Sequence, residues 1–360
     1  MEMNNITTDA TQTYEAFNRN DTSVTVKVFY VIIALLGVTG NGLVLYVFFK
    51  LPKLRVVPNL LISHQSLVDL IVSFLLFVSF VFPTTNVQSL NTNHHAFANF
   101  LCKCFISQFV FWASMRASTT NLVFLTLERY LAVVHPHLYR QRLSVKTAIF
   151  VCILAWCVGA LSILSSMIVY SVNERGQCSN DHLKDSGRVV IALVGFTITL
   201  VIPLVVMVFV YSSIIRAFRA SKEWSSKEQE VSTDSDNSAT VTEANASQTR
   251  SQNVYTVDVS KPRAERSEQL QTDGGRTTRN IFVTMFVICV TYLICWTPNQ
   301  ILYLHHNLVR QRDWTGPLHR FVILLAASNV CVNPIIYAFK YRSFRKGLKQ
   351  LFPKYVPSSF

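Results

Sequence analysis

Seven long apolar stretches, separated by polar segments, form the main pattern along this chain. A helix that crosses a bilayer needs about 20 mainly apolar residues, because the hydrocarbon core is about 30 Å thick and each helical residue rises about 1.5 Å. The stretches that meet this length are Val26–Phe49, Asn59–Phe82, Cys104–Val134, Lys146–Tyr170, Arg188–Phe218, Arg279–His305 and Leu318–Phe339. The pattern predicts an all-α membrane protein, a seven-transmembrane helix bundle whose termini lie on opposite sides of the membrane.

The polar segments divide the chain into a tail, a helical domain and a C-terminal segment. Residues 1–25 lack the basic and apolar regions of a cleaved signal peptide, so we expect the first helix to act as an uncleaved insertion signal. Residues 26–340 hold the seven helices. Within them, residues 221–275 are rich in Ser, Thr, Asn, Gln, Asp and Glu with almost no periodic apolar pattern, which predicts a disordered loop.

Residues 341–360 contain a short amphipathic pattern. Phe344, Leu348, Leu351 and Phe352 recur at helical spacing on one face, with basic residues opposite. This pattern is typical of a short amphipathic helix that lies in the membrane interface. Its apolar face and its bases would hold it to anionic lipid, so membrane lipid is an expected partner.

The distribution of charge predicts the orientation of the bundle. Half of the residues are hydrophobic, only 15% are charged, and the formal net charge is +13. Lys50, Lys53 and Arg55 follow the first helix, and an excess of Lys and Arg marks the cytoplasmic flank. The N-terminus is then extracellular, and the sequons at Asn5 and Asn20 become expected glycosylation sites. We expect no nucleic-acid partner, because that would need a soluble basic face.

Each of the seven stretches carries a distinctive residue or motif, and several of these contain polar groups, which are costly inside a membrane. In chain order the signals are Gly40-Asn41 with Val44, Leu67 with Asp69, Glu128-Arg129-Tyr130, Trp156, Pro203 with Tyr211, Cys295-Trp296-Thr297-Pro298 and Asn333-Pro334-Ile335-Ile336-Tyr337. With these signals the chain resembles the rhodopsin-like (class A) G protein-coupled receptors from about Val26 to Phe352. The stretches Glu128–Tyr139 and Trp296–Gln300 look most like the neuropeptide receptors of animals. The resemblance implies a plasma-membrane receptor that binds an extracellular ligand, activates a heterotrimeric G protein, and has arrestin and receptor kinases as further partners.

The resemblance assigns G-protein coupling and activation to residues in the cytoplasmic half. They are Glu128, Arg129, Tyr130, Tyr211, Asn333, Pro334 and Tyr337. Glu128 would hold the Arg129 guanidinium near the membrane face until the bundle opens, and the released arginine would face the G protein. The alternative is an interfacial ion pair that only snorkels to the headgroups. Tyr211 and Tyr337 resemble two tyrosines of the family that swing inward on activation, where their hydroxyls can meet through water.

A second polar group matches the positions that surround a sodium ion in many inactive members of the family. It consists of Asp69, Ser118, Asn329 and Asn333. A carboxylate with neutral oxygens suits a hard monovalent cation. The alternative is a water-filled hydrogen-bond network around Asp69 without an ion. We expect no other cofactor.

The resemblance also implies a disulfide between the second extracellular loop and the top of the third helix. Cys178 lies in that loop, and counting 25 residues back from Arg129 gives Cys104 as its partner. Cys102 is close enough to compete, and a Cys104–Cys178 bond would leave Cys102 as an unexplained extracellular thiol. We expect Cys104–Cys178, with Cys102 as the open alternative.

Two positions narrow the ligand class. Phe111 stands where amine receptors of the family carry an Asp, and Ala327 stands where opsins carry the Lys that binds retinal. Both differences argue against those ligands. The residues expected to form the ligand pocket are Gln108, Phe111, Trp112, Arg116, Trp296, Gln300 and Tyr303. This set can hydrogen-bond backbone amides and stack on side chains, so we expect a peptide, with a lipid or small acidic ligand as the alternative.

Arg116 and Tyr292 fit the pattern less easily. Arg116 lies near the middle of the membrane, where the fourth and fifth helices supply no acid. Its partners would be carbonyls, hydroxyls such as those of Ser165 or Ser166, and water, or else an acidic ligand group. Trp296 resembles the toggle tryptophan at the floor of the family's ligand pocket. Tyr292 replaces the Phe that the family typically has nearby, and its additional hydroxyl needs a partner.

Other function classes fit the residues less well. A seven-helix transporter or channel that moves ions through Asp69 and Arg116 remains as an alternative. An enzyme is not expected, because the chain shows no Ser-His-Asp set, no two-acid motif of the intramembrane proteases and no His-rich metal cluster on facing helices.

Overall fold

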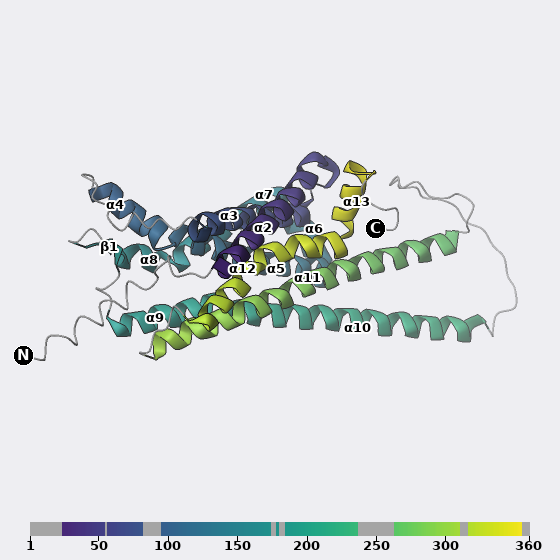
Figure 1. The fold of residues 1–360 in the computed structure, drawn as a ribbon. Helices are drawn as coiled ribbons and strands as arrows, with labels where there is room; N and C mark the ends of the chain where they lie inside the picture. Colours follow the sequence, from purple (N-terminus) through teal and green to yellow (C-terminus); the bar gives the residue numbers. More distant parts are fainter. Residues whose placement is uncertain are drawn as a thin grey trace, which may run out of the picture.

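The computed structural model describes residues 24–54, 56–81, 95–173, 178–179, 184–236, 263–309 and 316–354, and it contains the predicted bundle (Figure 1). Seven helical segments in this part of the chain are long and apolar enough to cross a membrane. They are α2 (Val24–Lys50), α3 (Val57–Val81), α4 (His95–Leu101) with α5 (Phe109–Val134), α7 (Val145–Ser162), α9 (Asp185–Phe196) with α10 (Ile202–Asp236), α11 (Arg263–Leu308) and α12 (Pro317–Lys340). The seven-transmembrane fold predicted from hydropathy is confirmed.

Short elements lie at the two ends of the bundle (Figure 1). At one end are α4, α8 (Leu164–Val169) and the antiparallel strands β1 (Ser171–Val172) and β2 (Cys178–Ser179). At the other end are α6 (Pro136–Arg142) and α13 (Arg342–Leu351). The charge pattern predicts that the first end is extracellular and the second cytoplasmic, and the two ends are named accordingly below.

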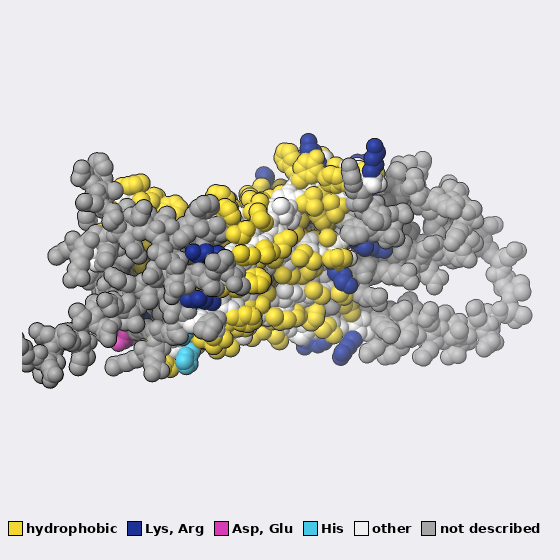
Figure 2. Space-filling model, in the orientation of Figure 1, with side chains coloured by type: hydrophobic (Ala, Val, Ile, Leu, Met, Phe, Trp, Pro, Cys, Tyr) yellow, Lys and Arg dark blue, Asp and Glu magenta, His cyan; other side chains and the backbone are white. Residues whose placement is uncertain are grey.

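The outer surface of the bundle is apolar where it would face lipid. Phe49 and Ile168 are both 73% exposed, and Leu161 is 68% exposed. Figure 2 shows hydrophobic side chains across the middle of the visible face, with Lys and Arg on both sides of this band. Apolar exposure of this extent would be unfavourable in water but is favourable against lipid tails. The surface therefore agrees with insertion into a membrane.

Two of the membrane-spanning segments contain a wide π turn in place of a continuous α-helix. The turn η4 (Cys102–Ile106) joins α4 to α5, and the turn η5 (Thr197–Val201) joins α9 to α10. After η4 the chain passes through Gln108, which has a left-handed φ of 57°. The turn η5 comes just before Pro203, which has no N–H to donate to the preceding turn. Both interruptions affect the candidate site.

Helices α10 and α11 extend into the segment predicted as a disordered loop. That prediction, for residues 221–275, is wrong at both ends, because α10 continues to Asp236 and α11 begins at Arg263. The physical reason lies in residue type. Residues 221–236 contain no Gly or Pro and several good helix formers, and the same holds for residues 263–272. The stretch between the two helices lies outside the described residues.

The predicted amphipathic helix is present as α13 and packs on the cytoplasmic end of α2. Phe344 is buried, and its ring centroid lies 6.2 Å from that of Phe48. Gly347 permits close packing, since a Cβ added there would lie 2.6 Å from Cγ1 of Val47 and would also meet the 3-10 turn η2 (Pro52–Leu54). The apolar face of α13 therefore packs against the bundle.

Candidate functional site

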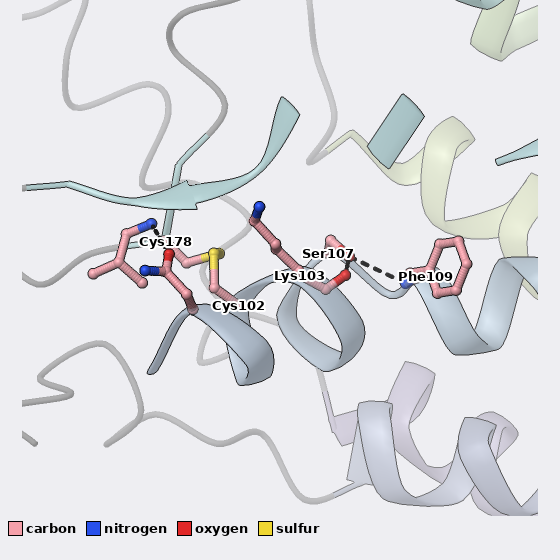
Figure 3. Close-up of a disulfide and its surroundings, with 7 residues drawn as sticks. Cys102, Lys103, Ser107, Phe109 and Cys178 are labelled. Carbon is pink, nitrogen blue, oxygen red and sulfur yellow. Dashed lines mark hydrogen bonds between the residues drawn. A yellow bond between two sulfur atoms is a disulfide. The ribbon is translucent and has the colours of Figure 1, made fainter. Parts of the chain in front are cut away.

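A disulfide between Cys102 and Cys178 joins the top of the third membrane-spanning segment to the second extracellular loop (Figure 3). Their Cα atoms are 5.5 Å apart, and their sequence separation is 76. Cys178 pairs with Val172 between the two strands, and the Val172 N–H donates to the Asn99 side chain of α4 at 3.1 Å. The predicted Cys104–Cys178 pairing is therefore wrong, and Cys104 is a buried free cysteine.

The wrong cysteine was predicted because of the backbone between η4 and α5. Counting back from Arg129 assumes one α-helix, but a π turn takes more residues per turn and the left-handed Gln108 breaks the helix. Ser107 stabilises the break, because its hydroxyl donates to the Lys103 carbonyl and accepts from the Phe109 N–H at 3.2 Å (Figure 3). The break accommodates additional residues, so the upper cysteine takes the loop partner. A polar Ser-Gln pair inside an apolar stretch was the signal in the sequence.

The predicted pocket residues lie on the third and sixth membrane-spanning segments. They are Gln108, Phe111, Trp112 and Arg116 at and below the start of α5, and Trp296, Gln300 and Tyr303 on α11. The three α11 residues follow at helical spacing and share one face. Arg116 of α5 and Tyr292 of α11 both hydrogen-bond to Thr199 in η5, which brings the two helices together below the pocket residues. The ring centroids of Phe111 and Trp112 lie 5.2 Å apart. The Gln108 side chain forms no hydrogen bond with another described residue.

Arg116 finds its partners on the fifth membrane-spanning segment. Its Nη1 donates to the Thr199 hydroxyl in η5 and to the Gly195 carbonyl of α9 at 3.4 Å. Gly195 permits this approach, since a Cβ added there would lie 3.3 Å from Nη2 of Arg116. The guanidinium thus has the carbonyl and hydroxyl partners of the structural alternative, supplied by η5 and α9 rather than by Ser165 or Ser166 of α8.

Tyr292 has the partner that its additional hydroxyl requires. The hydroxyl donates to the main-chain carbonyl of Thr199 at 2.5 Å. In an α-helix this carbonyl would accept from the N–H four residues later, but Pro203 has none. The Tyr292 ring lies 5.9 Å from the Trp296 ring. Tyr292 therefore connects the tryptophan at the expected pocket floor with the proline kink of the fifth membrane-spanning segment.

The same type of contact occurs at Pro334 in α12. Pro334 leaves the Val330 carbonyl without its helical donor, and Asn41 Nδ2 of α2 donates to that carbonyl at 2.8 Å. A Cβ added to Gly40 would lie 2.9 Å from Cβ of Pro334, so α2 and α12 are in close contact here. In both helices a polar side chain of a neighbouring helix replaces the donor that proline lacks, as expected inside a membrane.

Asp69 lies in the centre of the bundle and accepts hydrogen bonds from three side chains. Ser118 Oγ donates to Oδ1 at 2.8 Å, and Asn333 Nδ2 donates to Oδ2 at 2.8 Å. Gln65, one turn earlier on α3, donates from Nε2 to both oxygens at 3.2 Å. Asn329 is buried one turn before Asn333, and no hydrogen bond joins it to Asp69 in the described part of the chain. Ser118 and Asn333 thus come together with Asp69 as predicted.

The side chains around Asp69 do not fit a bound cation in this arrangement. A carboxylate offers about four acceptor positions, and protein donors are directed at both of its oxygens. Gln65 is also held from its other side, because its Oε1 accepts from Asn121 Nδ2 at 2.8 Å and its Nε2 donates to Ser118 Oγ. The geometry favours a hydrogen-bonded network. Gln65 was missed from the sequence, although its spacing of four residues from Asp69 placed it on the same helical face.

Glu128 and Arg129 form a buried ion pair at the cytoplasmic end of α5. Arg129 Nη2 and Glu128 Oε1 have no hydrogen-bond partner among the described residues. Tyr139 of α6 lies beside the pair, and burial together with the adjacent Glu128 carboxylate raises the pKa of Tyr139. The Tyr130 hydroxyl instead meets His135 Nε2 at 3.2 Å. A pair buried to this extent differs from snorkelling side chains, which keep their charges in water.

The two tyrosines predicted to meet on activation have separate surroundings. The Tyr211 hydroxyl lies 3.2 Å from Cys289 Sγ of α11. Tyr337 is fully buried, its ring lies 6.2 Å from that of Tyr341, and its hydroxyl has no hydrogen-bond partner within the described ranges. Arg129 is held in its ion pair with Glu128 in the same arrangement.

Comparison with known proteins identifies the family. The family described as 7 transmembrane receptor (rhodopsin family) matches residues 40–337. The match spans more than half of the chain and all seven membrane-spanning segments, apart from the start of the first and the last three residues of α12. The chain therefore belongs to the rhodopsin family of seven-transmembrane receptors, the class A G protein-coupled receptors. It is a multi-pass membrane receptor and not an enzyme.

The similarity to individual relatives is low in sequence identity but extends over most of this chain. The human cholecystokinin receptor type A is 27% identical over 90% of this chain and 79% of its own length. The human type-1 angiotensin II receptor is 24% identical over 95% of this chain and 84% of its own length. The Drosophila melanogaster RYamide receptor is 23% identical over 91% of this chain and 63% of its own length. Among solved structures, squid rhodopsin gives a TM-score of 0.66 at 18% identity, covering 91% of this chain and 85% of its own, which supports the fold.

Proposed function

We propose that this protein is a plasma-membrane receptor, with its N-terminus outside, that binds an extracellular peptide and activates a heterotrimeric G protein. The observation that carries the coupling role is the buried Glu128–Arg129 pair, in which Arg129 Nη2 has no partner among the described residues. A buried donor without an acceptor is unfavourable, and a G-protein helix that enters the opened bundle would supply the acceptor. Tyr130, Tyr211 and Tyr337 would rearrange with it.

The similarity to receptors named for cholecystokinin, angiotensin II and RYamide supports a peptide as the ligand. Two buried atoms on α11 point to the same class. Trp296 Nε1 is a donor and Gln300 Oε1 is an acceptor, and neither has a hydrogen-bond partner in the described residues. A peptide amide offers one carbonyl and one N–H and can satisfy both, whereas a lipid chain would leave both unpaired. Phe111 and Trp112 would add aromatic contacts.

Further partners are proposed on the cytoplasmic side of the membrane, and glycosylation on the extracellular side. Receptor kinases and arrestin would act on the cytoplasmic side, and anionic lipid would contact the bases of α13. The N-terminal tail would be extracellular and glycosylated at Asn5 and Asn20. These two residues lie outside the described part of the chain.

The test is to express the receptor in cells with a promiscuous G protein and to screen two libraries for calcium release, one of peptides and one of lipids and small acids. We expect a saturable response to a peptide. Gln300→Leu should lower the potency of that peptide about 10-fold or more, because it leaves an amide N–H unpaired, whereas the exposed neighbour Ile301→Ala should not. A response only to lipids or acids would contradict the peptide, and ion flux without a G protein would favour a transporter.

For the Asp69 site, we infer that the Gln65 amide takes the place that sodium would occupy. Agonist affinity should then change less than about twofold when sodium chloride is replaced by N-methylglucamine chloride at equal concentration. Gln65→Ala removes the competing donor and should make the affinity depend on sodium, and adding Asp69→Asn should abolish this dependence. A clear sodium dependence of the unmodified receptor would show instead that the ion displaces the Gln65 donor.

A further inference from the structure

Thr199 is contacted by two other membrane-spanning segments at once. Arg116 of α5 donates to its side-chain hydroxyl, and Tyr292 of α11 donates to its main-chain carbonyl at 2.5 Å. Thr199 is only 2% exposed, so both contacts lie inside the bundle. The third, fifth and sixth membrane-spanning segments therefore meet at one residue.

The Thr199 carbonyl is available to Tyr292 because of the backbone around it. At the end of η5 the Ile202 N–H bonds to the Thr197 carbonyl, five residues earlier. The next residue is Pro203, which has no N–H for the Thr199 carbonyl. Tyr292 supplies a donor to this carbonyl that the α-helical partner four residues later cannot supply, and a carbonyl short of donors is unfavourable in the membrane interior. The kink of the fifth membrane-spanning segment thus depends on a hydroxyl from α11.

Arg116 holds the other side of the same residue. Its guanidinium bridges the Thr199 hydroxyl and the Gly195 carbonyl, which lie about one turn apart around the start of η5. Hydrogen bonds from a charged donor are stronger than neutral ones and strengthen further where water is excluded. The π turn is consequently held to α5 by Arg116 while Tyr292 holds it to α11.

We propose that Arg116 and Tyr292 are positioning residues that hold α11 against the fifth membrane-spanning segment through Thr199 and keep the receptor closed. The inference rests on the proposed function, because it concerns the step between ligand binding and G-protein activation. The Tyr292 hydroxyl can stay on the Thr199 carbonyl only while α11 keeps its place beside η5. A ligand that displaces Trp296, whose ring lies 5.9 Å from that of Tyr292, breaks this bond and releases α11.

The experiment uses the purified full-length receptor and needs neither a ligand nor a G protein. Spin labels at Gln141→Cys in α6 and Val283→Cys in α11, both exposed positions, report the distance between the two helices. The exposed Cys157 is changed to Ser to prevent its labelling. Tyr292→Phe keeps the ring and removes the hydroxyl. We expect it to raise the ratio of open to closed populations about two- to tenfold, the effect of one hydrogen bond.

A double-mutant cycle separates this role from a general packing effect. Pro203→Ala supplies an N–H that can bond to the Thr199 carbonyl, so Tyr292→Phe should then change the ratio less than about twofold. Thr199→Val removes the acceptor of Arg116 and should raise the open population, whereas Thr199→Ser should not. Thr291→Val is the matched control, because the Thr291 hydroxyl donates to Val287 of its own helix at 2.8 Å.

Unchanged distance populations in both Tyr292→Phe and Thr199→Val would overturn the proposal, and so would an equal effect of Tyr292→Phe with and without Pro203→Ala. If Pro203→Ala does not fold, the open populations of Thr199→Val and Thr199→Ser are compared instead. Equal open populations in these two variants would then overturn the proposal. Melting temperatures of the same preparations show which variants are folded. The result is independent of the peptide screen, because a receptor that responds to no peptide can still open in Tyr292→Phe, and a peptide-responsive receptor can fail to do so.

Discussion

Cys102→Ala is expected to abolish agonist binding at the cell surface, and Cys178→Ala should have the same effect. The two cysteines are separated by 76 positions, and closing a loop of this length stabilises a protein by about 4–5 kcal/mol in the chain-entropy treatment. A loss of this size is comparable to the total stability of many domains. The bond also holds β2 and the second extracellular loop to the entrance of the proposed pocket, so binding should suffer even in molecules that fold.

Surface expression and agonist binding of single and double variants provide the measurement. The double variant Cys102→Ala with Cys178→Ala should be no worse than either single one, because all three lack the same bond. Cys104→Ala is the control, since Cys104 is a free cysteine two positions away, and it should retain expression and binding. If Cys104→Ala lost surface expression and agonist binding while Cys102→Ala kept them, Cys104 and not Cys102 would be the partner of Cys178.

Arg129→Ala is expected to abolish G-protein activation while agonist binding in the absence of G protein stays within about threefold of the unmodified receptor. Arg129 lies 13 residues below Arg116, or about 20 Å along the helix, so its removal should not reach the ligand site. Activation should fall because the charge-assisted contacts to the G protein, worth about 1.5–3 kcal/mol for each, are lost.

The measurement is agonist-stimulated nucleotide exchange on a purified G protein, together with agonist binding on the same membranes. Arg142→Ala is the matched control, because Arg142 is an exposed base on the same cytoplasmic side. Exchange by Arg129→Ala at the level of the unmodified receptor would remove the proposed role of the ion pair. An equal loss in Arg142→Ala would show that net charge at the surface, and not Arg129, is responsible.

The helices and much of the core could be predicted from the sequence. Each membrane-spanning segment must satisfy its own backbone, so length and hydropathy located all seven. Polar residues inside these segments are rare, so the few that occur were expected to meet. Asp69, Ser118 and Asn333 do so at 2.8 Å. The burial of Glu128 with Arg129 also agrees with the expected charge pair.

Features that depend on the exact path of the backbone could not be predicted. Hydropathy does not report how many residues a turn contains, so the π turn η4 and the left-handed Gln108 moved the disulfide from Cys104 to Cys102 without changing the apolar pattern. A lack of apolar periodicity likewise suggested disorder where α10 and α11 continue as helices. Helix propensity alone, without an apolar face, gives a weak signal.

Arg116 and Tyr292 show why a need for a partner does not identify the partner. Both were recognisable from the sequence as polar groups in apolar surroundings that require hydrogen bonds. Their shared partner includes the main-chain carbonyl of Thr199, and a carbonyl has no residue type by which a pattern could reveal it. Only the position of Pro203, four residues later, indicated that a carbonyl in this turn lacks a donor.

The central claim is that an extracellular peptide site and a cytoplasmic G-protein site are coupled through the bundle. The most direct test measures the affinity of the purified receptor for the peptide identified by screening, with and without nucleotide-free G protein. Coupling between two sites is reciprocal, so a peptide that promotes G-protein binding must itself bind more tightly when the G protein is present, by about 5- to 150-fold. We predict this increase and its reversal by a GTP analogue. Equal peptide affinity with and without the G protein would contradict the account.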